Sequence, residues 1–276
     1  MAAQVPGAFV ADTEAAARYR ARRRYLAGRR ILLPVVAVLV LLFAWSESIK
    51  LFDIKPFIAP SPQAVAAVLY ERFGILMTNL LPTAIESVLG FALGNLAAIV
   101  VATVFVWRKT VEEAMFPVAV MINSIPVVAK APILVLLLGN GMEPKIAVAA
   151  IICFFPTLVN MTRGLRDVRP EQIELMHVLS ASPGEVFLRI RVPNALPYLF
   201  SALKIAASTA VIGAIVGEWI GSTQGIGALI LQATFNFDSP LLYATIVVGS
   251  IFSAAFFGVI SLVERRMLRW HTAHKE

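Results

Sequence analysis

Charged residues inside otherwise apolar segments are the first candidates for chemistry in this chain. Lys130 lies within an apolar run, and Glu86 and Glu218 lie in or at the ends of two others. Because a charge at membrane depth costs about 3 kcal/mol, such groups usually face a partner or a water-filled path. We predict that Lys130 meets an anionic solute or forms a gate pair with Glu218 or Glu86. A purely structural ion pair is the alternative.

Neutral polar residues extend this candidate path. Asn123 and Ser124 stand in the same apolar run as Lys130. Their side chains can line a path for a polar solute, or they can form hydrogen bonds between helices, which is a common use of such residues in membranes. Both interpretations stay open at this point.

Motifs for nucleotide, metal or nucleophilic chemistry are missing from the sequence. It contains no G-x-x-x-x-G-K-[ST] loop, no G-x-S-x-G and no H-E-x-x-H. The only cysteine, Cys153, lies in an apolar run and has no intrachain partner for a disulfide. His271 and His274 near the C-terminus are better explained as a solvated tail than as metal ligands. We therefore predict no catalytic residue, no metal site and no cofactor in this chain.

The longest polar interruption covers residues 163–194. Its first part carries helix-start signals, with Pro170 in the first turn and Glu171 and Glu174 close behind. The helical pattern breaks at SASPG (180–184) and resumes through EVFLRIRV (185–192). We expect two short helices joined by a turn at Pro183 and Gly184. A loop this long is usually functional, so the segment is predicted to be a docking element.

The remaining composition indicates a protein with several membrane spans. Of the 276 residues, 59% are hydrophobic and 15% are charged, and the mean hydropathy is +0.80, whereas soluble domains carry about 25% charged residues. Six apolar segments are long enough, or nearly so, to cross a bilayer: 31–45, 80–106, 113–138, 145–162, 195–217 and 240–263. The predicted fold class is all-α, a polytopic membrane protein with six transmembrane helices.

Small residues recur along the fifth of these spans. A G-x-x-x-G pair, Gly213 and Gly217, follows a run of alanines at intervals of four: Ala202, Ala206, Ala210 and Ala214. Such faces let helices approach closely in lipid, where packing drives their association. We expect this span to pack tightly within the bundle or near a twofold axis.

Lysine and arginine residues are distributed unevenly over the two sides of these spans. Eighteen of the 24 fall in segments on the side of the N-terminus, and four fall on the opposite side. The bias predicts that both termini are cytoplasmic, and it explains the net charge of +7 without a nucleic-acid partner. The predicted parts are a basic tail (1–30), a membrane domain (31–266) with its cytosolic loop (163–194), and a C-terminal tail (267–276). On the other side, the stretch 59–76 is predicted to form a short amphipathic helix that starts at Ser61 and Pro62.

The cytosolic loop resembles the E-A-A-x-x-x-G-x9-I-x-L-P stretch of permease subunits of binding-protein-dependent ABC importers. In order, its specified positions are held here by Glu174, Leu175, Met176, Ser180, Ile190, Val192 and Pro193. Both alanines and the glycine of the stretch are replaced. Segments 124–141, 154–175, 192–206 and 210–230 also resemble the nitrate, sulfonate and taurine type of permease, a group that includes pyrimidine and riboflavin-precursor importers. The likeness extends from about Pro60 to Arg266.

The resemblance implies a type I importer in the bacterial inner membrane. Its parts would be two permease subunits, commonly a homodimer, two cytoplasmic ABC ATPase subunits that bind ATP and Mg, and an external substrate-binding protein. In that family the loop seats in a groove of the ATPase, with Glu174 here as the charged contact; the alternative is that Glu174 only favours its own helix. The residues assigned to ATPase coupling are Glu174, Leu175, Met176, Leu179, Ser180, Ala181, Ser182, Pro183, Gly184, Ile190 and Pro193.

The resemblance also adds residues to the predicted translocation path. In the family, the region between the last two spans lines the translocation path and its outer gate, which adds Trp219 and Gln224 to Glu218. That region is too short for a further crossing and is expected to turn back as a re-entrant element. The cargo stays open among nitrate, sulfonates, taurine, and pyrimidine or flavin precursors. Two alternatives remain: a stand-alone secondary carrier or channel, which needs no docking loop, and a membrane-embedded enzyme, which needs a catalytic constellation.

Overall fold

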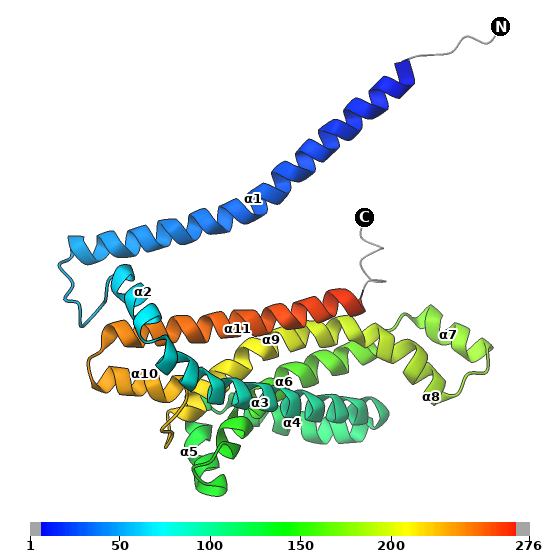
Figure 1. Cartoon of the computed structure of the whole chain (residues 1–276). Helices are drawn as coiled ribbons and strands as arrows, with labels where there is room; N and C mark the ends of the chain where they lie inside the picture. The colour runs from blue at the N-terminus through cyan, green and yellow to red at the C-terminus, as the bar shows by residue number, and fades with distance from the viewer. Residues whose placement is uncertain (1–6, 269–276) are drawn as a thin grey trace. The chain divides into compact units, whose positions relative to one another are not determined.

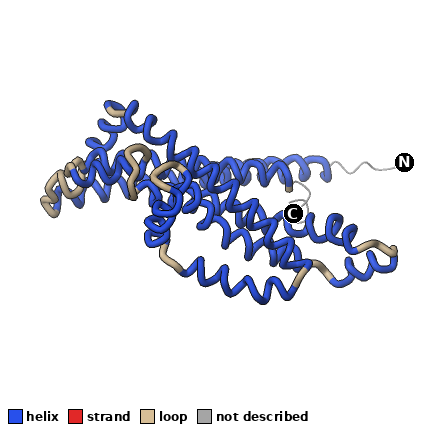
Figure 2. The backbone as a smooth tube through the Cα atoms, turned by 90° about the horizontal axis from the view of Figure 1, so that it is seen from below, coloured by secondary structure: helices blue, strands red, loops and turns tan. Residues whose placement is uncertain are grey.

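The computed structural model describes residues 7–268, and all the regular secondary structure in that part of the chain is helical (Figure 1). Figure 2 shows the helices joined by loops, most of which are short. The chain divides into two compact units, residues 1–64 and residues 65–276. The predicted all-α class is therefore confirmed. Within the predicted C-terminal tail (267–276), residues 269–276 lie outside the described residues, and so do His271 and His274.

The first unit consists mainly of the long helix α1 (Gly7–Leu51). Its apolar part, Leu32–Leu51, has 20 residues, which at 1.5 Å per residue is about the thickness of the hydrocarbon core. The helix therefore extends the predicted first span, 31–45, by two turns. The predicted amphipathic helix follows as α2 (Pro62–Glu71), with the Ser61 hydroxyl accepting a hydrogen bond from the Ala64 amide at 3.2 Å.

Four long helices dominate the second unit: α3 (Phe73–Trp107), α6 (Glu143–Arg166), α9 (Val192–Glu218) and α11 (Ser239–Met267). α6 packs against both α3 and α9, and α11 packs mainly against α9 (Figure 1). All four are long and apolar enough to cross a membrane, as is Leu32–Leu51 of α1. These five helices correspond to five of the six predicted spans.

Small residues allow α9 and α6 to pack closely. The four alanines at intervals of four are all fully buried: Ala202, Ala206, Ala210 and Ala214. A Cβ atom on Gly213 would lie 2.8 Å from the Cα atom of Ala149 on α6, which is closer than carbon atoms approach. The predicted tight packing of this span within the bundle is confirmed, and α6 is the helix against which its glycines pack.

The predicted span over residues 113–138 is broken in the structure. The structure has two helices there, α4 (Lys109–Ser124) and α5 (Val127–Leu138), which are bent by 100° relative to each other. Ile125 between them is extended, with φ −68° and ψ 128°, because a following proline disfavours the helical conformation. The sixth span therefore exists only as a bent pair, and Lys130 lies beyond the bend from Asn123 and Ser124.

Between α9 and α11 the chain forms the short apolar helix α10 (Ile226–Phe235). Its 10 residues reach about 15 Å, half of what a crossing needs. α10 packs against both α9 and α11. This short helix agrees with the expectation that the region between the last two spans does not form another crossing.

Candidate functional site

The predicted docking loop forms a helix, a tight turn and a second helix at one end of the bundle (Figure 1). The first helix is α7 (Pro170–Val178), and the second begins as α8 (Pro183–Val186). We call residues 167–191 the coupling segment. The second short helix predicted over residues 185–192 is not separate, because α8 continues through the π-helical turn η1 (Phe187–Arg191) into α9. One unbroken helical path therefore joins Pro183 to Glu218.

The turn of the coupling segment lies three to four residues earlier than the predicted position at Pro183 and Gly184. Pro183 and Gly184 are the first two residues of α8, where proline fits because its missing N–H is not needed. The reversal is made at Ser180, whose φ of 53° is in the left-handed region that favours glycine. Ser182 and Glu185 then form a capping box, in which each side chain accepts a hydrogen bond from the other's backbone N–H.

An apolar face of α7 is exposed. Leu175 and Leu179 are 59% and 65% exposed, and Val178 between them is 80% exposed. Their spacing of three and four residues places them on one side of the helix, and Glu174 beside them is exposed as well. Val178 was not among the predicted coupling residues, although the same spacing in the sequence could have identified it.

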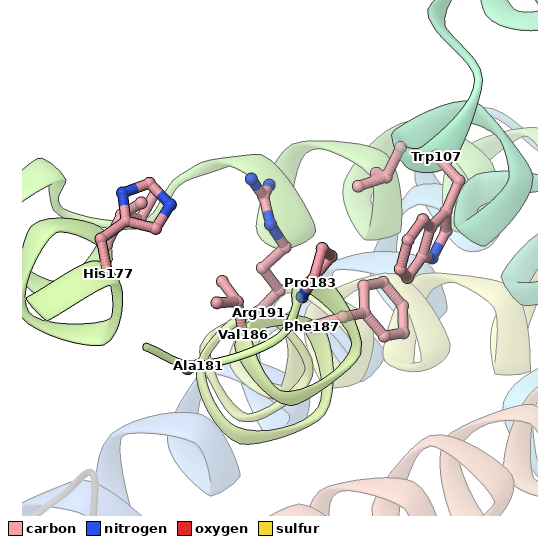
Figure 3. Close-up of a pocket in the computed structure, with 9 residues that line it drawn as sticks. Trp107, His177, Ala181, Pro183, Val186, Phe187 and Arg191 are labelled. Atoms are coloured by element: carbon pink, nitrogen blue, oxygen red, sulfur yellow. The ribbon is translucent and has the colours of Figure 1, made fainter. Parts of the chain in front are cut away.

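The other predicted coupling residues do not share this face. Met176 is half-buried, and Ala181 lines a cavity of about 360 Å³ between the coupling segment and the end of α3. Figure 3 shows Trp107 and Phe187 at one end of this cavity, with ring centroids 5.5 Å apart, and His177 at the other. Ile190 and Pro193 are half-buried within the continuous helix, so they are placed to hold the coupling segment rather than to form its outer surface.

Side chains of η1 and α9 bind the C-terminal end of α6. Arg191 Nη1 donates to the Leu165 carbonyl oxygen at 3.0 Å. Asn194 Nδ2 donates to the carbonyl oxygens of Gly164 at 3.0 Å and Asp167 at 2.6 Å. A helix leaves its last carbonyl groups without partners of its own, so these bonds fix the coupling segment to the bundle.

A second polar site lies at the opposite end of α9, around Glu218. This carboxylate is fully buried; its Oε1 atom accepts from the Thr83 hydroxyl at 2.5 Å, and its Oε2 atom accepts from the Gly227 amide at 2.6 Å. The Thr83 hydroxyl in turn accepts from the Ile226 amide at 2.8 Å. We call Thr83, Glu86, Lys145 and Glu218 the carboxylate cluster. It joins α3, α6, α9 and the first turn of α10.

Two glycines make room for the buried carboxylate. A Cβ atom on Gly225 would collide with the Glu218 carboxylate, and one on Gly227 would collide with the Ile215 carbonyl oxygen and contact Glu218. Gly225 also has a φ of 111°, which side chains other than glycine rarely tolerate. Its amide donates to Asn79 Oδ1 on α3 at 3.0 Å.

Glu86 forms an ion pair that the sequence did not predict. Its carboxylate is 1% exposed and lies 3.9 Å from the ammonium group of Lys145, which is 6% exposed. The predicted pairing of Lys130 with Glu86 or Glu218 is not formed, and Lys130 has no ion pair among residues 7–268 although it is buried on α5. Lys145, at the start of the predicted span 145–162, lies in the first turn of α6, next to Pro144.

The remaining path candidates are dispersed. Asn123 and Ser124 are exposed on α4, and Ser124 donates its hydroxyl only to the Val120 carbonyl oxygen of its own helix. Trp219 is partly exposed at the end of α9. The structure does bring Glu86 and Gln224 together, because both line a cavity of about 310 Å³ beside Lys145.

The two sites are separated by about the thickness of a membrane. Lys145 is in the first turn of α6 and Arg166 is its last residue, so at 1.5 Å per residue they lie roughly 30 Å apart. This distance matches the hydrocarbon core of a bilayer. A solute path and a docking surface on opposite faces of a membrane require this kind of separation.

Comparison with known proteins assigns the chain to a family. Residues 90–269 match the family described as binding-protein-dependent transport system inner membrane component. The match covers more than half of the chain, so the chain belongs to this family, and the family expected from the sequence is confirmed. The protein is therefore a permease, a transport component of an ABC importer rather than an enzyme.

Relatives that match most of the chain are also described as permeases. A probable ABC transporter permease of Haemophilus influenzae is 35% identical over 86% of this chain and 97% of its own. The formylaminopyrimidine transport permease ThiX of Halalkalibacterium halodurans is 33% identical over 86% and 95%. The riboflavin transport system permease RibX of Chloroflexus aurantiacus is 31% identical over 87% and 90%.

A solved structure shares the fold. An inward-facing form of the MetNI methionine ABC transporter matches 71% of this chain and 98% of its own chain, with a TM-score of 0.62 and 16% identity. Membership of the family implies a multi-pass protein of the inner membrane that works with an ATPase and a substrate-binding protein. An importer permease fold is thus confirmed.

Proposed function

We propose that the coupling segment receives the ATPase subunits and passes their movement to the carboxylate cluster through α9. The observation that carries this proposal is the unbroken helical path from Pro183 to Glu218. A continuous helix moves as one body, whereas a loop between α8 and α9 would absorb a displacement. ATP and Mg would be bound by the ATPase subunits, and the coupling segment would face the cytoplasm together with both termini.

The exposed face of α7 is the part of the coupling segment best suited to contact the ATPase. Leu175, Val178 and Leu179 form a small apolar patch in a part of the chain that the predicted topology puts in the cytosol. Exposed apolar patches with a polar rim are typical of protein contacts, and Glu174 supplies a charge at the edge of this one. We assign the ATPase contact to these four residues, with Ser180 and Ser182 shaping the turn behind them.

The permease is proposed to act as a homodimer. The small-residue face of α9 packs against α6 of the same chain. The dimer contact is therefore expected on another face of the bundle. A groove between α9, α10 and α11, with a volume of about 550 Å³, is lined by Ile212, Ile230, Ile246 and Phe257. We place the twofold contact on this groove.

For the cargo, we propose a small heterocycle of the pyrimidine or flavin-precursor class. This choice rests on the names of two relatives that are 33% and 31% identical. Nitrate, sulfonates and taurine are the alternatives. Mass spectrometry of the small molecules that the cognate binding protein retains after purification decides between them: a heterocycle supports the proposal, and a sulfonate contradicts it.

The coupling role is tested by reversing the charge of Glu174. In proteoliposomes that contain the permease, its ATPase and its binding protein, we expect Glu174→Lys to abolish most ATP-driven uptake while the permease stays folded. The matched control is Glu171→Lys, which is also an exposed position, in the first turn of α7, and which should keep uptake near that of the unchanged protein. Normal uptake in Glu174→Lys would remove this residue from the mechanism.

A further inference from the structure

The cavity beside the carboxylate cluster has the features of a binding site. Its volume is about 310 Å³, and its polar lining consists of Glu86, Asn140, Lys145, Ser222, Thr223 and Gln224. Glu86 is almost completely buried, and its Oε2 atom has no hydrogen-bond partner among residues 7–268. Buried polar atoms in proteins are nearly always paired, so an unpaired carboxylate oxygen beside a cavity points to a ligand.

The two carboxylates of the cluster are satisfied to different degrees. Both oxygens of Glu218 accept short hydrogen bonds, from Thr83 and from the Gly227 amide. The Glu86 carboxyl group lies 3.9 Å from the ammonium group of Lys145, which is longer than the roughly 2.8 Å of a charge-assisted hydrogen bond, and it also interacts with the Glu218 carboxyl group. The Oε2 atom of Glu86 is left without a hydrogen-bond partner among residues 7–268.

The carboxyl groups of the cluster also act on each other. Glu86 and Glu218 lie close enough to interact electrostatically and through a side-chain hydrogen bond, and Lys145 acts on both. Two facing carboxyl groups can share one proton, which leaves the cluster without excess charge beside the Lys145 ammonium group. The Oε2 atom of Glu86 is then an acceptor for a solute that carries N–H donors.

The walls of the cavity suit a small planar solute. Asn140 and Gln224 present amide groups that can donate and accept, and the apolar side is formed by Leu81, Pro82 and Ile85. Small-molecule sites typically combine a volume of about 300–1,000 Å³ with apolar walls and a few fixed polar groups. The cavity is at the lower end of this range.

We propose that this cavity is a binding site for a solute that presents N–H donors to Glu86, such as the amino group of a pyrimidine, and that it does not bind a solute without such donors. The inference rests on the proposed function, because it assumes that solute passes this end of the bundle. It assigns the selective role to Glu86, with Asn140 and Gln224 as wall contacts.

Direct binding to the purified complex of permease and ATPase, without the binding protein, tests the inference. The probes are cytosine, which carries an amino group, and methanesulfonate, which carries a sulfonate and no N–H group, and binding is followed by saturation-transfer difference NMR. We expect cytosine to give a signal that Glu86→Gln reduces at least tenfold and Asn140→Ala reduces a few-fold. Methanesulfonate should give none. The matched control is Glu143→Gln, an exposed position at the same end that does not line the cavity.

Several outcomes would overturn the inference. An equal signal from methanesulfonate, no signal from cytosine, or a cytosine signal that survives Glu86→Gln would each remove the proposed site. ATP-driven uptake is measured with the same preparations after the binding protein is added. Uptake without a cytosine signal contradicts this inference alone, whereas a cytosine signal without any ATP-driven uptake contradicts the proposed function instead.

Discussion

The two ends of the bundle are held together by contacts of different range. In the coupling segment, the bonds that shape the turn join neighbours, such as Ser182 with Glu185 and the Ala181 amide with the Met176 carbonyl. In the carboxylate cluster, Thr83 and Glu218 are 135 residues apart, and Lys145 comes from a third helix. A short stretch of chain can therefore form the turn, whereas the cluster needs the assembled bundle.

The two ends of the bundle also differ in how deeply their side chains are buried. The outer face of α7 is exposed, whereas Thr83, Glu86 and Glu218 are almost completely buried. Substitutions in the cluster should therefore lower the stability of the bundle, and substitutions in the coupling segment should lower transport while the bundle stays folded. The following predictions test this contrast, from the largest expected effect to the smallest.

Replacement of Gly227 by valine should be the most damaging change. Its Cβ atom would collide with the Ile215 carbonyl oxygen and crowd Glu218, so we expect a loss of about 4 kcal/mol of stability or a failure to fold. Unfolding in mixed detergent micelles measures this loss. The counterpart at the other end is Gly184→Ala, where an added Cβ meets nothing within 4 Å; a similar loss there would break the contrast.

Thr83→Val should destabilise the bundle by about 3 kcal/mol, because it leaves the Ile226 amide and one oxygen of Glu218 buried without a partner. The same unfolding measurement applies. Thr103→Val is the control on the same helix, since that hydroxyl donates only to the Ile99 carbonyl of its own helix. If both variants lose the same stability, the hydrogen bonds of Thr83 within the carboxylate cluster do not stabilise the bundle more than an ordinary helical threonine does.

Ser182→Ala should loosen the coupling segment without unfolding the bundle. Loss of this N-cap removes the bond to the Glu185 amide and costs about 1 kcal/mol locally. We expect faster hydrogen exchange of the amides at the start of α8 and slower ATP-driven uptake, with the global unfolding transition unchanged. A shift of the global transition comparable to that of Thr83→Val would show that the two ends are not independent.

Ser180→Gly should have the smallest effect, and it should be favourable. The left-handed φ of 53° at this residue is strained for a serine by about 1 kcal/mol, and glycine adopts it freely. We expect slower hydrogen exchange in the turn by a few-fold. Ser182→Gly, at an ordinary φ of −67°, should bring no such gain; equal protection in both variants would rule out backbone strain as the cause.

The sequence predicted the coupling end better than the carboxylate end, because its signals are local. Pro170 with early glutamates identified α7, and the motif position of Ser180 marks a residue that the structure places in the left-handed region. The boundary errors, at Pro183 and at the start of α9, arose because a π-helical turn has no clear pattern in sequence. The break at Ile125 was missed because apolar runs alone do not distinguish a bent pair from one span.

The carboxylate cluster could be predicted only in part. Glu86 and Glu218 were identified because charges in apolar segments are rare, but their partners were not. Thr83 looks like any helical threonine, and Lys145 looks like a charge at the end of a span, until the folding of the bundle brings α3, α6 and α9 together. Lys130 was favoured by the same reasoning as Glu86, and no pattern in the sequence distinguishes the lysine that pairs from the one that does not.

The central claim is that movement of the coupling segment reaches the carboxylate end through α9. The chain has a single cysteine, so Cys153→Ser combined with Thr223→Cys places one thiol at the mouth of the cavity, where Thr223 is exposed. The rate of its reaction with a charged maleimide is measured in the assembled importer, with and without ATP and vanadate. We predict a several-fold change on trapping that Glu174→Lys abolishes; an equal change in Glu174→Lys, or none with the intact coupling segment, would contradict the account.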